Sequence, residues 1–132
     1  MRWLLLLALC APASAQRTLD EVVNALAAVR RFSDVAISPD GRRVAWVEDV
    51  HGSNGEATGS TSLYAFELNQ PGAKPQRISG ARGTNPQTHD SAPVWSPDSS
   101  SLLFLSDAAR TGELQVYLWR VAGTARKLTS VV

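Results

Sequence analysis

The stretch "AISPDGRRVAWVEDV", residues 36–50, decides the fold, because its middle returns downstream as "VWSPDSSSLLFLSD", residues 94–107. Both copies contain an apolar strand, a Ser-Pro-Asp corner, a small residue and a second apolar strand, in that order. Proline presets φ for the first corner of a type I turn, aspartate fits the second, and glycine takes the left-handed position that follows. Each copy therefore predicts a β-hairpin closed by a three-residue loop.

The two corners differ in their last residue, which is Gly41 in the first copy and Ser99 in the second. Glycine adopts the left-handed conformation freely, whereas serine meets a steric cost there. We therefore expect the second turn to be looser than the first or to have a different shape.

Four strands are expected in each copy, because apolar and polar residues alternate with a period of two between turn signals. In the first copy the strands cover residues 32–38, 42–49, 62–69 and 75–80. A polar, glycine-rich loop at 50–61 connects the second of these strands to the third. In the second copy they cover 88–96, 101–107, 114–121 and a short segment within 122–130. The strand at 42–49 is apolar on both faces, which is typical of a strand buried between two layers.

The copies are offset by 58 residues at the corner, from Ser38 to Ser96, and by 53 residues at the tyrosines, Tyr64 and Tyr117. Shorter loops in the second copy account for the difference. Repeats of about 40–50 residues with four strands each are typical of β-propeller blades. We therefore predict an all-β fold of two four-stranded antiparallel propeller blades, an incomplete β-propeller preceded by one amphipathic helix and a signal peptide.

The expected division of the chain is a signal peptide at 1–15, an N-terminal helix at 16–31, and blades at 32–87 and 88–132. Arg2, a short apolar run and an Ala-Ser-Ala end indicate the signal peptide. A membrane anchor needs about 20 apolar residues, roughly twice the length of this run. A lipoprotein anchor on Cys10 is not favoured, because Leu9 stands where such signals place a small residue. The helix is indicated by a capping box and an apolar stripe, and we expect it to cover an edge or a base of the sheets.

Cleavage would remove Cys10, the single cysteine, and Arg2, one of 13 basic residues that stand against 12 acidic ones. An exported chain without cysteine has no disulfide and no thiol nucleophile. A neutral charge balance does not suit a surface that binds polyanions. We therefore expect no nucleic-acid partner, and no membrane span in the mature chain.

The corners "ISPDGRRVAWV" and "WSPDSSSLLFL" resemble the Ser-Pro-Asp-Gly blades of TolB-like propellers and of the prolyl oligopeptidase family. The resemblance covers residues 32–132. Only residues 16–31 separate the expected cleavage site from the first blade. This short N-terminal segment resembles that of exported bacterial peptidases of the acylaminoacyl-peptidase and dipeptidyl-peptidase type. TolB itself has a separate α/β domain ahead of its propeller.

The peptidase resemblance implies a non-catalytic N-terminal β-propeller segment that caps and gates a C-terminal α/β-hydrolase domain of the same, longer protein. Peptide substrates would pass through the propeller channel, and the location would be periplasmic or extracellular. The family's catalytic serine lies in a Gly-x-Ser-x-Gly motif of the hydrolase domain. No such motif occurs in this sequence, so we expect no catalytic, cofactor-binding or metal-binding residue and no cofactor. Whether the parent protein is an enzyme stays open, with a serine peptidase favoured.

Two alternatives remain open. One is a periplasmic TolB-like propeller that acts as a protein-binding or scaffold module. The other is a 132-residue product that folds by self-assembly. Propellers close with 4–8 blades, so two blades leave bare apolar faces that further sheets must cover.

The histidines and the carboxylates have structural explanations. We expect His51 and His89 to be surface residues, because no nucleophile or metal-ligand spacing accompanies them. The consecutive residues His89-Asp90-Ser91 are not expected to act as a triad, since neighbouring strand residues point to opposite faces. Turn formation explains the corner acids, Asp40 and Asp98. The strand-end acids, Asp34, Asp49 and Asp107, are expected to be solvated.

The tryptophans Trp46, Trp95 and Trp119 occupy strand positions. They are expected to pack between blades rather than to stack on a ligand.

Overall fold

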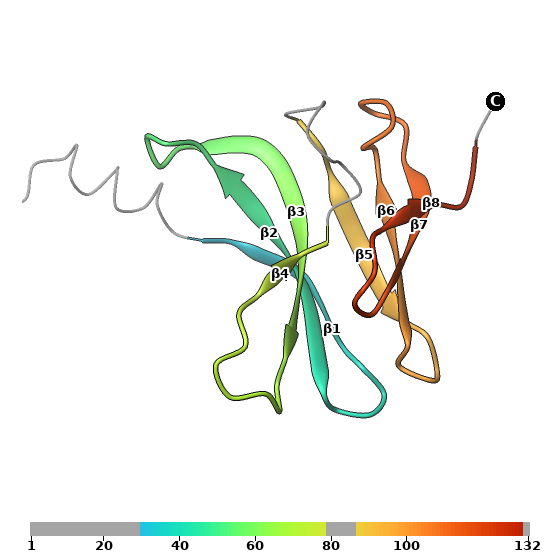
Figure 1. Cartoon of the computed structure of the whole chain (residues 1–132). Helices are drawn as coiled ribbons and strands as arrows, with labels where there is room; N and C mark the ends of the chain where they lie inside the picture. Colours follow the sequence, from blue (N-terminus) through green and yellow to red (C-terminus); the bar gives the residue numbers. More distant parts are fainter. Residues whose placement is uncertain (1–29, 79–86, 131–132) are drawn as a thin grey trace, which may run out of the picture.

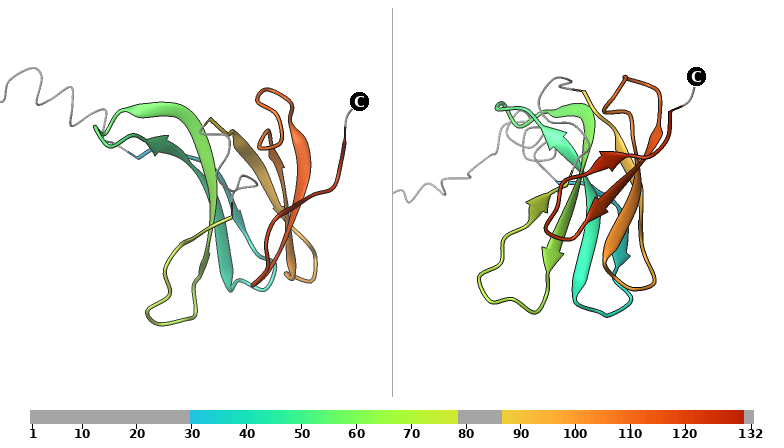
Figure 2. Two further views of the ribbon diagram at one scale, coloured as in Figure 1. Left: turned by 45° about the horizontal axis from the view of Figure 1, so that its top comes forward. Right: turned by 45° about the vertical axis from the view of Figure 1, so that its right-hand side comes forward.

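The computed structural model of the chain describes residues 30–78 and 87–130. Within these ranges the chain forms two four-stranded antiparallel sheets that lie side by side (Figures 1 and 2). The all-β prediction is therefore confirmed. The expected signal peptide at 1–15 and nearly all of the expected helix at 16–31 lie outside the described residues.

Each sheet is a meander in which neighbouring strands follow one another along the chain. The first sheet consists of β1 (Phe32–Ile37), β2 (Arg43–His51), β3 (Ala57–Glu67) and β4 (Gln76–Arg77). The second consists of β5 (Asp90–Trp95), β6 (Ser101–Ser106), β7 (Gln115–Arg120) and β8 (Arg126–Lys127). Pro75 precedes the edge strand β4, where the missing N–H costs no ladder bond.

The two Ser-Pro-Asp corners have the same shape. The amide of Gly41 donates to the Ser38 carbonyl at 2.8 Å, and the amide of Ser99 donates to the Ser96 carbonyl at 2.9 Å. Gly41 and Ser99 are both left-handed, with φ of 69° and 60°. The expectation of a looser or different second turn is therefore wrong.

Contacts with the first sheet explain why Ser99 accepts this conformation. Its hydroxyl oxygen accepts a hydrogen bond from the Asp40 amide at 3.1 Å, and its carbonyl accepts one from Arg43 Nη1 at 3.2 Å. Serine here costs strain of about 1 kcal/mol. In return it provides an acceptor that glycine lacks.

Substitutions at Ser99 are expected to separate these two effects. Ser99→Ala keeps the left-handed strain and removes the acceptor of the Asp40 amide, so it should destabilise the fold by about 1–2 kcal/mol. Ser99→Gly also removes the acceptor but relieves the strain, so its net effect should lie within about 0.5 kcal/mol of zero. Urea unfolding followed by tryptophan fluorescence measures both. Equal losses in the two variants would contradict this explanation.

The segment 50–61, expected to be a loop, is mostly strand. β2 continues to His51 and β3 begins at Ala57, so the connection is a short turn. Within it Gly55 has φ of 81° and its amide donates to the Gly52 carbonyl at 3.0 Å. The glycines therefore supply the conformations of a tight hairpin turn and not those of a long loop.

The core lies between the sheets. Ala45 and Val47 of β2 and their partners Ala65 and Leu63 of β3 face the second sheet. They belong to the buried cluster Ala45, Val47, Leu63, Ala65, Ile78, Trp95, Leu102, Phe104, Tyr117 and Trp119. We call this contact between the two sheets the seam.

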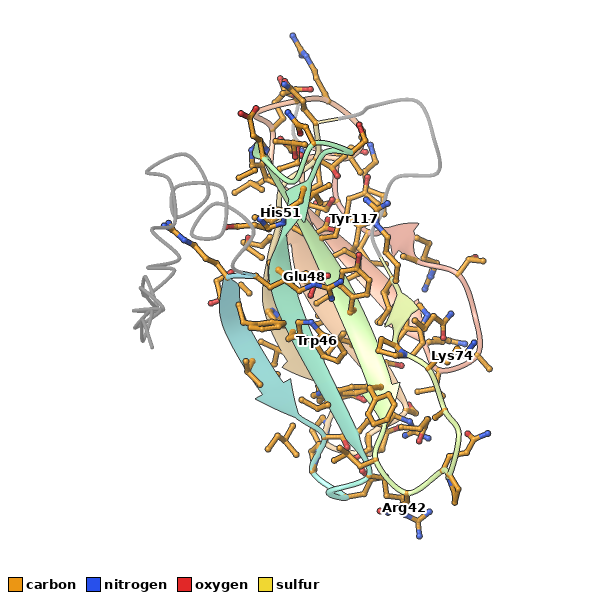
Figure 3. All side chains as sticks on the ribbon, turned by 90° about the vertical axis from the view of Figure 1, so that its left-hand side faces the viewer. Arg42, Trp46, Glu48, His51, Lys74 and Tyr117 are labelled. Carbon is orange, nitrogen blue, oxygen red and sulfur yellow. The ribbon has the colours of Figure 1, made fainter. Side chains whose placement is uncertain are left out.

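The two sheets stack in the same direction, face to back. In the seam the second sheet contributes Phe104 and Tyr117, stacked with ring centroids 5.7 Å apart. The equivalent residues of the first sheet, Trp46 and its strand partner Tyr64, are stacked at 5.8 Å. Trp46 lies on the outer face, away from the second sheet (Figure 3). Each sheet therefore presents an aromatic side and an aliphatic side, as units of one repeating stack do.

Both outer faces of the sheet pair are apolar. The aromatic face, on the first sheet, consists of Val44, Trp46, Tyr64 and Phe66. The aliphatic face, on the second sheet, consists of Leu103, Leu105, Val116 and Leu118. Strand β2 was expected to be buried on both faces, but within the described residues only its Ala45 and Val47 side is covered.

Candidate functional site

Polar groups from the two sheets meet along the seam and hold its register. The Asp34 carboxylate accepts a hydrogen bond from the Ala92 amide at 3.0 Å, and Trp95 Nε1 donates to the Ala36 carbonyl at 3.1 Å. Asp34 and Ala92 are both left-handed, with φ of 36° and 51°, and each lies in an irregularity of the strand pairing. The irregularity at Ala92 turns its amide to the other sheet, which a regular ladder would not allow.

The most polar part of the seam contains His89 and Asp107. The His89 amide donates to Asp107 Oδ1 at 2.7 Å, and His89 Nδ1 lies 3.0 Å from Asp107 Oδ2. On its other side, His89 Nε2 lies 2.8 Å from the carbonyl oxygen of Gly59, in the first sheet. A carbonyl and an ionised carboxylate can only accept, so the ring satisfies both contacts when both nitrogens carry protons.

Ionisation of this pair follows from its contacts. The hydrogen bond to Asp107 raises the pKa of His89 above its ordinary value, against the opposing effect of partial burial. Burial by itself would raise the pKa of Asp107, but the donors Gly112 and His89 outweigh it and hold that pKa below the ordinary value. Both pKa shifts favour the charged forms, an imidazolium at His89 and a carboxylate at Asp107, and Asp90 also raises the pKa of His89.

The link between His89 and Gly59 should make stability depend on pH. Because the folded pKa of His89 is raised, its contribution is complete below about pH 6.5 and is lost as the pH rises through the folded value. The ring is half exposed, so we expect less than about 1 kcal/mol. His89→Gln should flatten the fall in stability above pH 6.5, while the control His51→Gln should not. Urea unfolding at a series of pH values tests this, and an unchanged slope in His89→Gln would contradict it.

Asp90 lies next to this pair and is buried. Its Oδ2 accepts a hydrogen bond from the Leu63 amide at 3.2 Å, and its backbone exchanges two hydrogen bonds with the Thr61 hydroxyl. Its other carboxylate oxygen, Oδ1, is buried without a protein partner. Asp90 thus fixes β5 against β3 across the seam.

The three consecutive triad-type residues do not come together. His89 pairs with Asp107 and not with Asp90, and Ser91 pairs with Leu105 on the other face of the sheet. Both ring nitrogens of His89 lie against acceptors, Asp107 Oδ2 and the Gly59 carbonyl oxygen, and neither is paired with a serine hydroxyl. His51, the other histidine, lies at the end of β2 with Nδ1 3.2 Å from the Asp49 carbonyl oxygen.

The strand-end acids differ from one another. Asp34 is exposed, but Asp107 is 1% exposed, so the expectation of a solvated carboxylate is wrong for Asp107. The physical reason is that three donors of the second sheet converge on it: the His89 amide, the His89 ring and the Gly112 amide. The sequence signal that could have indicated this buried acceptor is a strand-end aspartate followed by a glycine-containing loop, here Asp107 and Gly112.

The corner acids serve their turns, as predicted. Ser38 Oγ donates to Asp40 at 2.6 Å and Ser96 Oγ donates to Asp98 at 2.5 Å. Hydrogen bonds from Ser96, and then from Ser100, lower the pKa of Asp98 to about 2. Asp40 has a lowered pKa for the same reason, with Ser38 the main donor. These carboxylates are therefore turn acceptors and not proton donors near neutral pH.

The tryptophans divide between two faces. Trp95 and Trp119 lie in the seam in an edge-to-face contact, with centroids 6.2 Å apart, which confirms the expected packing between sheets. Trp46 lies on the aromatic face instead, against Tyr64, with Nε1 3.3 Å from Glu48 Oε2. Within the described residues no second sheet covers Trp46, because its strand position points to the outer side, so its expected packing between blades stays a prediction.

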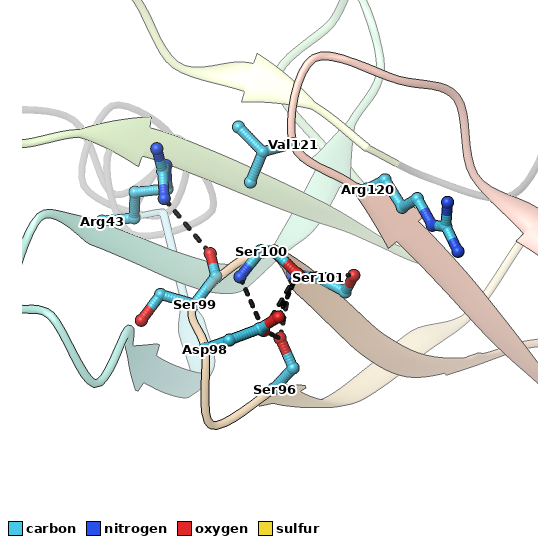
Figure 4. Close-up of a pocket in the computed structure, with 8 residues that line it drawn as sticks. All are labelled: Arg43, Ser96, Asp98, Ser99, Ser100, Ser101, Arg120 and Val121. Atoms are coloured by element: carbon cyan, nitrogen blue, oxygen red, sulfur yellow. Dashed lines mark hydrogen bonds between the residues drawn. The ribbon is translucent and has the colours of Figure 1, made fainter.

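A hollow of about 740 Å³ lies at the corner end of the second sheet, between Arg43 and Arg120 (Figure 4). Serine hydroxyls line it, but those of Ser96 and Ser100 donate to the Asp98 carboxylate and no histidine adjoins them. Arg43 Nε pairs with the Glu67 carboxylate. The hollow has neither an activated nucleophile nor an unpaired positive cluster, so nothing in it indicates catalysis.

Two further features bear on function. Within residues 30–78 and 87–130, no three His, Cys, Asp or Glu side chains gather as a metal site would require. In those same ranges, no helix is long and apolar enough to cross a membrane.

Comparison with known proteins shows a similarity to part of a bacterial protein. No model of a known protein family matches the chain. The chain is 33% identical over 109 residues to "Uncharacterized peptidase YuxL" of Bacillus subtilis (strain 168). The aligned region is 80% of this chain but only 15% of that protein, so the chain spans a small part of the length of the peptidase it resembles.

Proposed function

We propose that the chain is the non-catalytic N-terminal β-propeller segment of an exported serine peptidase. Its two sheets would be the first two blades, and together with further blades they would cap and gate a C-terminal α/β-hydrolase domain. The observation that carries the proposal is the face-to-back stacking of two equivalent meanders, in a chain similar to part of a peptidase. Export to the periplasm or the medium, expected from residues 1–15, belongs to the same proposal.

The sheet geometry supports the propeller. Propellers arrange four-stranded sheets around a central channel. In the seam the first strands of the two sheets, β1 and β5, contact each other. These strands would therefore border the channel, while the short strands β4 and β8 would lie at the rim. Peptides that reach the active site would pass the exposed side of β1 and β5.

The chemistry of the described residues supports a non-catalytic role. The corner serines donate to carboxylates, and both ring nitrogens of His89 lie against acceptors, Asp107 and the Gly59 carbonyl. Neither arrangement activates a nucleophile. Under this proposal the serine nucleophile lies in the hydrolase domain, and these sheets form part of the cap that limits access to it.

The reading frame beyond Val132 provides the first test. The proposal expects a Gly-x-Ser-x-Gly motif several hundred residues downstream. A stop codon there, or a domain of another kind, would overturn it. A reading frame that encodes further blades and no hydrolase domain would instead favour a TolB-like scaffold. A pull-down of cell-envelope proteins would then test that alternative.

Activity provides the second test. The longer protein should react with a fluorophosphonate probe and cleave short peptides, while the 132-residue chain should do neither. Removing residues 32–132 from the longer protein should allow it to attack larger substrates, if the blades act as a filter. Hydrolysis by the 132-residue chain that a serine-directed inhibitor abolishes would contradict the proposal.

A further inference from the structure

The part of β3 from Ser60 to Leu63 brings together more buried polar atoms than its direct contacts satisfy. The Leu63 amide donates to Asp90 Oδ2 at 3.2 Å, and the Thr61 hydroxyl exchanges two hydrogen bonds with the Asp90 backbone. Three further atoms, Ser60 Oγ, Ser62 Oγ and Asp90 Oδ1, are buried and have no hydrogen-bond partner among the described residues. All three of these residues are at most 2% exposed.

An unpaired carboxylate oxygen is the most costly of these three atoms, because a buried charge is poorly solvated. Buried polar groups in folded proteins are nearly always paired. Where the protein supplies no partner, an internal water molecule commonly does, and it makes two to four hydrogen bonds to the groups around it. Asp90 Oδ1 therefore marks a site for a small polar ligand inside the seam.

The Leu63 amide brings Asp90 and Ser62 close to each other. This amide directly follows Ser62 in the chain, and it points at the Asp90 carboxylate. The carboxylate therefore lies at the edge of β3, beside both faces of the strand. Side chains alternate along a strand, so Leu63 points into the seam and Ser62 to the other face. A molecule at this edge can donate to Asp90 Oδ1 and accept from the Ser62 hydroxyl.

We propose that an internal water molecule binds between Asp90 Oδ1 and the Ser62 hydroxyl and completes the polar contact between β3 and β5. Water suits this site better than a metal ion, because a hard cation needs six or more oxygen ligands. Within residues 30–78 and 87–130, no three His, Cys, Asp or Glu side chains gather to supply them. The site lies inside the seam, so the proposal depends neither on what covers the outer faces nor on peptidase activity.

A crystal structure of the protein, at a resolution that orders internal waters, tests the proposal directly. We expect a water oxygen within about 3.2 Å of both Asp90 Oδ1 and Ser62 Oγ. An empty site would overturn the proposal, and so would a protein donor on Asp90 Oδ1. Contacts of about 2.3–2.6 Å to several oxygens would show a bound cation in place of water, and would also overturn it.

Replacement of Ser62 by alanine gives a second test in solution. If the hydroxyl holds the water, the melting temperature should fall by about 3–6 °C. Oxygen-17 magnetic relaxation dispersion should then lose the signal of about one long-lived water molecule. If the hydroxyl is simply unpaired, alanine removes its burial penalty, and an unchanged or higher melting temperature would contradict the proposal.

Ser106→Ala is the matched control for the water signal. Ser106 is as fully buried as Ser62, but its Oγ already accepts a hydrogen bond from the Ala108 amide at 3.3 Å. This variant should keep the full oxygen-17 signal. Equal losses of signal in the two variants would mean that the water is not bound at Ser62, and would overturn the proposal.

Discussion

Replacement of Phe104 by alanine is expected to lower the free energy of unfolding by about 3–5 kcal/mol. Phe104 is 2% exposed, lies in the centre of the seam and stacks on Tyr117. Its removal loses apolar burial and leaves a cavity between two sheets that cannot close over it. Urea unfolding of the monomer, at low protein concentration, gives the change.

Trp46 supplies the matched control, because it is the first-sheet equivalent of Phe104 on the outer face. Trp46→Ala should cost about 1–2 kcal/mol, since a partly exposed ring that stacks on one neighbour loses less contact. Equal losses in the two variants would mean that both aromatic sides are equally buried, which contradicts the arrangement described here.

Replacement of Asp107 by alanine is expected to destabilise the fold by about 2–4 kcal/mol. The carboxylate is buried and accepts from the His89 amide, the His89 ring and the Gly112 amide. Alanine leaves those donors without an acceptor at the end of the seam. Asp107→Asn keeps one acceptor oxygen and should lose about half as much. Thermal and urea unfolding at pH 6 compare the variants.

Asp49 is the matched control for this prediction. It lies at the equivalent position of the first sheet, 58 residues before Asp107, and is only partly buried. Asp49→Ala should therefore change stability by no more than about 0.5 kcal/mol. If the two alanine variants lose the same amount, the convergence of donors on Asp107 is not what stabilises that loop.

The local features of the fold could be predicted from the sequence because their causes are local. Proline and aspartate indicate the corners at Ser38 and at Ser96, since the aspartate accepts hydrogen bonds from its own turn. Period-two alternation then locates the strands, and short connections make consecutive strands neighbours. Strand ends were less predictable. Gly55 serves a tight hairpin turn, and a glycine in a polar segment indicates a turn or a loop equally well.

The polar contacts of the seam could not be predicted, because their partners are distant in the sequence. Ser99 was expected to distort its turn, and only the Asp40 amide and Arg43 of the other sheet show why it does not. Asp107 resembles any strand-end acid until His89 and Gly112 are placed around it. The direction in which the sheets stack likewise places Trp46 on the outer face. The alternation of residues along one strand defines two faces but does not show which of them contacts the other sheet.

Nuclear Overhauser contacts between the two sheets test directly whether the equivalent meanders stack face to back. Contacts are expected from the rings of Phe104 and Trp119 to the methyl groups of Ala45, Val47 and Leu63. None is expected within one molecule from those rings to Trp46 or Tyr64. Contacts between the Phe104 and Trp46 rings of one molecule would instead place the two aromatic sides together and contradict face-to-back stacking.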